Sequence, residues 1–578
     1  MEVLEYDLVV LGSGLAGMRA ALQAAKADDK LKIAIVSKLH AMRSHSVSAE
    51  GGISGVLYTG ESDSAKLHAY DTIKGSDYLS DQDAVEILVG NAPGEIKLFD
   101  NLGVPWNKGE KGKIELRAFG GMSVPRTAFA ADKTGFFMLS TLYDTLLGMP
   151  NVKFFHEYMA TKLFVEDSKF KGLFTIDMAT GDSVVFVSKA CIIATGGFAR
   201  IFDFTTTAHS STGDGIALAY EAGMQLKDME FVQFHPTALV PSGILITEAS
   251  RGEGGYLVNS KGERFMERYA KSKMELAPRD IISRAIITEI EAGRGIKDKR
   301  FGNYEYVHLD LRHLGEAKID ERLPMIKEIS MKMAGIDPSK EPIPVRPAAH
   351  FTMGGINTDI KGRISAGARH GTLGLWAAGE CGCISVHGAN RLGSNSLSQC
   401  VIWGRITGNE AARFASTSKK PSGNRIMADI EKEEGRINSL LERKEGENPY
   451  AIREELRRTM DASFGVYRNS AAMSRGRKKV IELRKRFKNI VVRDKSRVYN
   501  TNLRDALEIG NAVELALVVA ECAINRKETR GAHSRKEYPK RDDRSWLKHT
   551  IAQKSGNRVK ITYSKVEITK WQPEERKY

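Results

Sequence analysis

Short apolar runs separated by helix-forming stretches dominate the first two thirds of the chain. A strand at 6–11 leads through a glycine turn into an Ala-rich, proline-free helix at 16–26, and an apolar strand follows at 33–36. Such strand–helix–strand units are typical of a parallel sheet. Further buried strands are predicted at 190–194 and 374–379. Although these segments lie far apart in the sequence, we expect them to form one sheet of a nucleotide-binding domain.

The spacing of apolar positions then changes and predicts additional parts. Residues 236–347 carry strands and helices of their own and end at Pro342, Pro344 and Pro347, which indicates an inserted domain. Farther along, helical spacing covers 425–445, 450–475 and 502–526, and one strand is predicted at 559–568. The predicted parts are 1–235 and 348–410 for the nucleotide-binding domain, 236–347 for the insertion, 411–529 for a helical domain and 530–578 for a C-terminal arm.

The chain is basic, with 86 Lys and Arg against 72 Asp and Glu, a net charge of +14. Eight of the basic residues and only one acidic residue lie between 475 and 488. Such a run is typical of a solvated helical face, with docking of an acidic partner as the alternative. No recognisable nucleic-acid-binding module accompanies it, so nucleic acid is not expected as a partner.

No apolar run reaches the 18 residues expected of a membrane-spanning helix, and the N-terminus enters a strand without a signal peptide or twin-arginine leader. We therefore expect a cytoplasmic protein that meets a membrane only through a partner. The chain has five cysteines, and only Cys381 and Cys383 are close in sequence, which is a poor signature for zinc or an iron–sulfur cluster. No metal is predicted on this chain.

A dinucleotide-binding fingerprint follows the first strand. Gly12 permits the tight turn, Gly14 lets the backbone approach a pyrophosphate, and Gly17 allows close packing of helix on strand. The next helix N-terminus then faces the phosphate charge. The acidic residue expected at the end of the second strand is replaced by Ser37 and Lys38, which disfavours a plain NAD site. We expect the Ser37 hydroxyl among the groups that hold the ribose.

The segment 43–53 specifies the cofactor, through Ser44, His45, Gly51 and Gly52. It resembles the flavinylation motif of succinate dehydrogenase and fumarate reductase flavoproteins, whose histidine carries FAD covalently at the 8α-methyl. His45 occupies that position, whereas the similar L-aspartate oxidases lack the histidine. The resemblance thus implies a Rossmann-like FAD-binding α/β domain with an inserted capping domain, followed by the helical domain and arm. Glu50, where many dehydrogenases have Gln, favours the reductase type slightly.

The resemblance extends the FAD site to Asp214, Glu380, Ser396 and Leu397. Carboxylates such as Asp214 or Glu380 can accept hydrogen bonds from ribose or ribityl hydroxyls.

A dicarboxylate site is implied by the same family. Arginine suits bidentate capture of a carboxylate, and a four-carbon dicarboxylate needs donors at both ends. We expect Arg391 with His350 at one end and His235 with Thr247 at the other, and Phe119 beside the substrate.

The reaction implied by the resemblance is hydride transfer between a substrate carbon and flavin N5, with proton transfer at the adjacent carbon. Arg279 takes the place of the family's proton-transferring arginine, relayed to solvent through Glu248 and Arg251. The flanking cations and Glu248 are expected to make proton passage through an arginine possible, since a free guanidinium stays protonated.

The resemblance covers residues 5 to about 550 and also implies partners. In the family this subunit passes electrons to an iron–sulfur subunit, and membrane anchor subunits carry the quinone site. The chain would then lie at the cytoplasmic face of the cell membrane within respiratory complex II, which serves electron transport and the tricarboxylic acid cycle. Two alternatives remain: a soluble relative such as L-aspartate oxidase or a thiol-linked fumarate reductase, and a non-catalytic flavin-binding scaffold.

Overall fold

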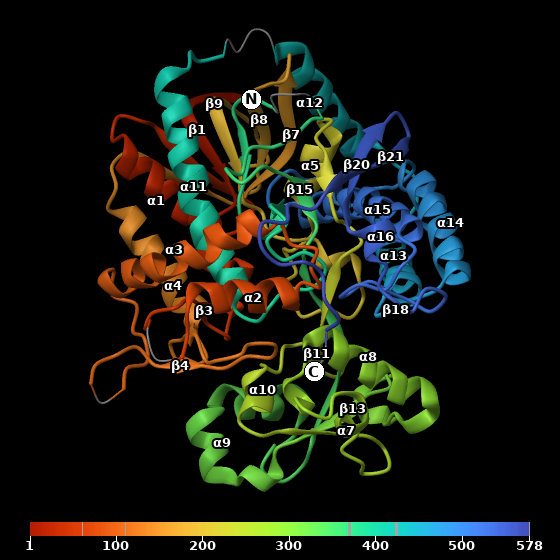
Figure 1. The fold of residues 1–578 in the computed structure, drawn as a ribbon. Helices are drawn as coiled ribbons and strands as arrows, with labels where there is room; N and C mark the ends of the chain where they lie inside the picture. The colour runs from red at the N-terminus through yellow and green to blue at the C-terminus, as the bar shows by residue number, and fades with distance from the viewer. Residues whose placement is uncertain (60–61, 110, 368–371, 422–425, 577–578) are drawn as a thin grey trace.

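The structure, a computed structural model, describes residues 1–59, 62–109, 111–367, 372–421 and 426–576 (Figure 1). Its central sheet has the strand order β6-β2-β1-β9-β8-β7, with β16 also paired to β9. The outer strands of this order are β6 (Val152–His156), β8 (Lys169–Asp177) and β7 (Tyr158–Glu166). The strands β1 (Glu2–Leu11), β2 (Ile33–Ser37), β9 (Ser183–Ile193) and β16 (Leu375–Ala377) run parallel to one another. The prediction that these distant segments share one sheet is confirmed.

Helices α1 (Leu15–Ala27) and α11 (Asn395–Thr417) lie side by side against this sheet (Figure 1). They approach closely because Gly404 and Gly408 face the α1 backbone, where a Cβ atom would lie 2.6 and 2.3 Å from the carbonyl oxygens of Ala16 and Ala20. Helix α11 runs across residue 410, the predicted domain boundary. The cover is completed by α2 (Ala65–Gly75), α3 (Gln82–Asn101) and α4 (Thr134–Leu147).

The inserted domain, green in Figure 1, has a hydrophobic core of its own that includes Leu257, Phe265, Ile286 and Leu309. Two antiparallel strands, β11 (Val232–Leu239) and β14 (Ile343–Thr352), connect it to the nucleotide-binding domain. Two of the prolines that mark the predicted exit, Pro344 and Pro347, lie within β14. The domain also contains β12 (Tyr256–Val258), β13 (Val307–Asp310), α8 (Arg279–Glu289), α9 (Glu316–Arg322) and α10 (Pro324–Ala334).

The helical domain differs from its prediction in the middle. Helix α13 (Pro449–Phe464) ends before β18 (Tyr467–Arg468), and α14 (Ser470–Phe487) begins after it, so a single helix over 450–475 was wrong. The break exists because β18 pairs with β19 (Ser534–Arg535) of the arm, an interaction with a distant segment. Helices α12 (Met427–Glu442) and α15 (Thr501–Asn525) match their predictions, although residue 425 lies outside the described residues.

The basic run lies on α14, and much of its charge is paired. Arg477, Arg484 and Arg486 contact glutamates at 2.6 Å or closer, including Glu521 and Glu514 of α15. This pairing fits a solvated helical face.

The C-terminal arm forms a hairpin. The predicted strand at 559–568 is confirmed as β21 (Arg558–Lys565), and its partner β20 (Lys548–Ser555) was missed. Strand β20 also pairs with β10 (Leu226–Lys227), which joins the arm to the rest of the molecule.

Within the described ranges, no helix combines the length and apolar character needed to cross a membrane. In the same part of the chain, no three His, Cys, Asp or Glu side chains gather as a metal site would require.

Candidate functional site

A cavity of about 610 Å³ lies where the carboxyl ends of β1 and β2 meet the inserted domain. It is lined by residues from both domains, and nearly all predicted site residues contribute to it. The predicted residues that line it are Gly12, Gly14, Ser37, Lys38, Ser44, His45, Gly51, Gly52, Phe119, Asp214, His235, Thr247, Glu248, Arg279, His350, Glu380, Arg391, Ser396 and Leu397. Gly17 and Arg251 lie behind this lining.

The glycine turn has the geometry that its motif predicts. Gly12 has φ +113°, and a Cβ there would lie 2.3 Å from the oxygen of Ala194. A Cβ on Gly17 would lie 2.0 Å from the oxygen of Gly12, so only glycine lets α1 start this close to β1. A Cβ on Gly14 would lie 3.3 Å from Ser46 Oγ, a tight contact, and Gly14 lines the cavity.

Lys38 and Asp214 pair with each other. Lys38 Nζ lies 2.6 Å from Asp214 Oδ2 and 2.7 Å from Glu508 Oε1, and Asn511 donates to Asp214 Oδ1 at 2.9 Å. Although burial opposes both shifts, the ion pair raises the pKa of Lys38 and lowers that of Asp214. The carboxylate predicted to bind ribose or ribityl hydroxyls is thus already engaged by protein donors. Glu508 and Asn511, about 300 residues away on α15, carried no local signal.

Ser37 lies at the end of β2 and lines the cavity. Its Oγ accepts a hydrogen bond from Ser13 at 2.8 Å, and both residues line the cavity.

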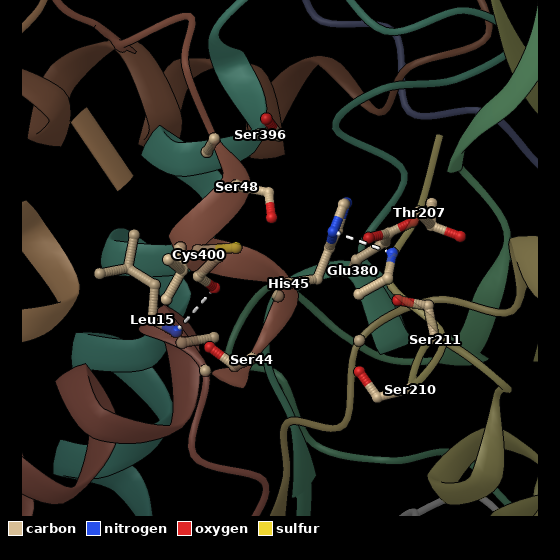
Figure 2. A pocket seen from close by; sticks show the side chains of 18 of the residues that line it. Leu15, Ser44, His45, Ser48, Thr207, Ser210, Ser211, Glu380, Ser396 and Cys400 are labelled. Carbon is tan, nitrogen blue, oxygen red and sulfur yellow. Dashed lines mark hydrogen bonds between the residues drawn. The ribbon is translucent and has the colours of Figure 1, made fainter. Parts of the chain in front are cut away.

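His45 begins a short 3-10 turn beside the start of α1 (Figure 2). Its Nδ1 accepts a hydrogen bond from the backbone N–H of Ala208 at 3.2 Å. Burial, with Arg200 nearby, lowers the pKa of His45 to about 4, so the ring is neutral at pH 7. The turn is held by Ser46, whose Oγ accepts from Leu15 N at 3.0 Å. Sequence reasoning assigned no role to Ser46 or Ala208.

Next to this turn, Gly51 and Gly52 allow close contacts. A Cβ on Gly52 would lie 2.4 Å from the oxygen of Ala128, and one on Gly51 would lie 3.3 Å from the Phe119 ring. Burial, with Asp132, raises the pKa of Glu50 to about 8.

Glu380 lies at the opposite wall, where its Oε1 accepts hydrogen bonds from Thr352 N and Oγ1 at 2.9 and 3.1 Å. Burial raises the pKa of Glu380 to about 7 despite these bonds. Ser396 Oγ accepts from Arg391 Nη1 at 3.3 Å, which connects the predicted FAD site to the predicted dicarboxylate site. Leu397 lines the cavity in the next position.

The far end of the cavity is built from both domains. His235 lies on β11, His350 on β14 and Arg279 at the first position of α8, while Arg391 precedes α11. The His235 and His350 rings are 5.0 Å apart. His350 Nε2 lies 3.3 Å from Arg391 Nη2 and must accept, because arginine only donates. Its Nδ1 then donates to Thr206 Oγ1 at 2.7 Å.

This end is strongly cationic. Burial, together with the neighbouring arginines, holds the pKa values of His235 and His350 well below their usual range, and that of Arg391 is lowered in the same way. His235 Nε2 and Arg391 Nε are buried and find no hydrogen-bond partner among the described residues. Buried donors are normally paired. The arrangement therefore fits an anion with carboxylate oxygens.

Arg279, Glu248 and Arg251 form a buried chain. Arg279 Nε donates to Glu248 Oε2 at 2.9 Å, and Arg251 Nη2 lies 3.7 Å from the same oxygen. The two arginines lower the pKa of Glu248 although its burial raises it. Gly120 N donates to Glu248 Oε1 at 2.6 Å, and Gln233 Oε1 accepts from Arg279 at 3.1 Å. Gln233 was missed, although it stands two residues before His235 on the same strand.

Two protein families match the chain. A model described as "FAD binding domain" matches residues 7–397, and one described as "Fumarate reductase flavoprotein C-term" matches residues 453–578. The fumarate reductase flavoprotein subunit of Serratia sp. is 43% identical, covering 100% of this chain and 97% of the relative. The succinate dehydrogenase flavoprotein subunit of Rickettsia felis is 42% identical, covering 98% and 96%.

Solved structures agree with these matches. The FrdA chain of E. coli quinol fumarate reductase superposes with a TM-score of 0.96 at 41% identity, covering 100% of this chain and 99% of the other. The Mycobacterium smegmatis Sdh1 complex gives a TM-score of 0.85 at 33% identity, covering 100% and 96%.

Proposed function

The chain belongs to the family of fumarate reductase and succinate dehydrogenase flavoprotein subunits, and from this we propose how its residues interconvert fumarate and succinate. The observation that carries the proposal is the cationic end of the cavity, with unpartnered buried donors on His235 and Arg391. A four-carbon dianion supplies a carboxylate to each donor. Bound FAD supplies the hydride acceptor or donor, and the chain supplies binding, orientation and a proton.

Binding is assigned to two pairs of side chains. Arg391 binds one carboxylate, and His350 lies beside that carboxylate and orients the guanidinium, because its Nε2 accepts from Arg391 Nη2 at 3.3 Å. His235 and Thr247 hold the other carboxylate from the inserted domain's side. Positioning of this kind can lower the barrier by several kcal/mol.

Proton transfer is assigned to Arg279. Glu248, kept ionised by the two arginines, accepts or returns the proton through its hydrogen bond with Arg279 Nε. Arg251 continues this chain behind Glu248. Its Nη1 donates to the backbone carbonyl oxygen of Glu275 at 2.5 Å. Because neighbouring positive charges destabilise a protonated guanidinium, they favour release of its proton to Glu248.

The residues present fit FAD, and we propose that His45 binds it covalently. The ring is neutral at pH 7 because its pKa is about 4, so it carries a single N–H. Because Nδ1 accepts from Ala208 N, that proton is on Nε2, and Nε2 would be the attachment atom, losing its proton as the bond to FAD forms. Denaturing electrophoresis viewed for flavin fluorescence tests this. We expect a fluorescent protein band that His45→Ala abolishes, and fluorescence only at the dye front would overturn the assignment.

We infer the partners from the complexes that the chain resembles. Two similar structures are a quinol–fumarate reductase with menaquinol molecules and the Mycobacterium smegmatis Sdh1 in complex with UQ1. An iron–sulfur subunit would accept electrons from this chain, and membrane anchor subunits with a quinone site would hold it at the cytoplasmic face. Co-purification of an iron–sulfur protein supports this arrangement, and purification of the chain alone in active form favours the soluble alternative.

Activity is the direct test. The FAD-loaded protein should oxidise a reduced viologen dye with fumarate and reduce an oxidised dye with succinate. Oxidation of L-aspartate without succinate turnover would contradict the proposed reaction.

A further inference from the structure

The inserted domain is a separate body whose placement decides whether the substrate site is complete. It has its own core and continues into the FAD-binding domain through β11 and β14. Arg279 approaches the cavity from this body, whereas Arg391 approaches from the FAD-binding domain. Any contact that fixes one body on the other therefore sets the distance between these two groups.

One such contact is made by the end of the C-terminal arm. Arg576 Nη2 lies 2.7 Å from Oδ2 of Asp280, the residue that follows Arg279 on α8. Arg576 Nε lies 3.2 Å from Oδ1 of Asp77 in the FAD-binding domain. The side chains of Arg576, Asp77 and Asp280 are only 9%, 7% and 1% exposed, so this bridge is buried.

Asp77 is a firm anchor for this bridge. It follows α2 with φ +57°, and its carboxylate accepts hydrogen bonds from Gly531 N and from Arg541 Nη1, both at 2.8 Å. On the other side, Asp280 also accepts from Arg284 Nη2 at 3.0 Å. Arg576 thus joins two carboxylates that lie in different domains, and the arm also holds Asp77 through Gly531 and Arg541.

The same arm follows α8 along its length. Arg284 Nη1 donates to the Gly531 oxygen at 2.8 Å, and Lys536 Nζ lies 2.9 Å from the Glu291 carboxylate just beyond the helix. In Figure 1 the arm, dark blue, runs toward α8, where Arg576 contacts Asp280. Among these contacts, the bridge at Asp280 lies nearest in sequence to Arg279.

We propose that Arg576 is a positioning residue for the reaction: it locks the start of α8 to Asp77 and so holds Arg279 in register with Arg391. This inference rests on the proposed role of Arg279. A buried ion pair is specific because removing one partner leaves the other carboxylate unpaired. Without the bridge, the first turn of α8 has greater freedom, and the reacting geometry is reached less often.

The test uses the Arg576→Gln variant, loaded with FAD and purified together with any partner subunits that remain bound to it. Because small displacements of a positioned group cost rate, we expect kcat for fumarate to fall about tenfold with a smaller change in KM. Hydrogen exchange of residues 279–289 should rise. Arg576→Lys, which keeps the charge, should restore part of kcat. Lys570→Gln is the matched control, since Lys570 pairs with Glu86 of α3 at 3.0 Å on the same tail.

A double-mutant cycle separates the bridge from a general loss of stability. If Arg576 acts through Asp280, Arg576→Gln combined with Asp280→Asn should be no worse than the more damaging single change. Unchanged kcat and unchanged exchange of α8 in Arg576→Gln would overturn the inference, as would an equal loss in Lys570→Gln. If Arg279→Gln loses turnover while Arg576→Gln keeps normal turnover and normal exchange of α8, only the inference about Arg576 is overturned. If Arg279→Gln retains turnover, the proposed proton transfer by Arg279 is overturned as well.

Discussion

The two ends of the cavity are built in different ways. The cofactor end consists mainly of backbone and small residues from one domain, such as Gly12 and Gly17, held by the sheet and by α1. The substrate end consists of long charged side chains contributed by two domains, such as Arg279 and Arg391. The first end is fixed by the fold of one domain, whereas the second depends on how two bodies are held together.

The electrostatics of the two ends differ in the same way. At the cofactor end, burial raises the pKa values of Glu50 and Glu380 to about 8 and about 7, so these acids hold protons near neutral pH. At the substrate end, arginines surround Glu248 and keep it ionised. The proposed cofactor end thus holds two buried acids that keep their protons, beside the Lys38–Asp214 ion pair, while the proposed substrate end concentrates arginines.

The largest expected effect is on turnover alone, from a substitution at the substrate end of the cavity. Arg279→Gln should reduce turnover by about 10³-fold, because general acid–base groups contribute on that order, while FAD content stays normal. Steady-state assays and the flavin absorbance of the purified protein check both parts. Lys327→Gln, which alters an ion pair with Glu316 and Asp320 elsewhere in the inserted domain, is the control and should retain full turnover.

The arm offers a pH-dependent test. His549 lies between Asp228 and Asp81, at 2.6 and 3.0 Å, and these carboxylates raise its pKa to about 9 despite its burial. A raised pKa stabilises the fold below the unfolded-state value of about 6.5, and this stabilisation is lost as the pH rises toward 9. The loss should be on the order of 3 kcal/mol. Melting temperatures at pH 6 and pH 9 check this, and His549→Gln should remove most of the difference.

If His549→Gln melts with the same pH dependence as the parent protein, another group is responsible for that dependence.

Because the arm holds the inserted domain, activity should fall as the pH rises, and it should do so before FAD is released.

A change confined to the cofactor end should act through the fold. Gly17→Ala places a Cβ 2.0 Å from the Gly12 oxygen and should cost about 1–3 kcal/mol of stability, together with FAD content. Gly435→Ala is the matched control: it lies in α12 with no atom within 4 Å of its added Cβ, and it should be neutral or stabilising. Chemical denaturation and flavin content distinguish the two. Equal losses would mean that the close contact at Gly17 has no special cost.

The smallest expected effect concerns Glu50. Since its pKa is about 8, the side chain is neutral at pH 7, as glutamine is. Glu50→Gln should therefore change kcat at pH 7 by less than about twofold and should remove any rate change that depends on ionisation above pH 8. A large loss at pH 7 would show that the carboxyl proton itself takes part.

The same contrast explains what could be predicted from sequence. The glycine turn and the His45 segment are contiguous motifs, and their positions in the cavity follow from β1 and α1. The order of Arg279, His350 and Arg391 could be matched to a family, but their distances depend on packing between domains. Glu508, which pairs with Lys38, and Arg576, which joins Asp77 to Asp280, are separated from their partners by hundreds of residues, and nothing local indicates the pairing.

Secondary structure was predicted wrongly where pairing with a distant segment overrides the local preference. The segment around Tyr467 has helical neighbours on both sides but forms β18, because β19 of the arm pairs with it. Strand β20 was also missed, although its hairpin partner β21 is adjacent in sequence; its second partner, β10, lies more than 300 residues earlier.

The most direct test is to titrate the oxidised, FAD-loaded protein with a four-carbon dicarboxylate that does not react. The flavin absorbance spectrum is recorded at each addition. Because the cationic end adjoins the cofactor end, the account predicts a saturable shift of the flavin spectrum that a monocarboxylate does not produce. Arg391→Gln should abolish the shift and leave FAD content unchanged. A spectrum that does not respond in the parent protein, or that responds equally in Arg391→Gln, would contradict the claim that one cavity holds both ligands.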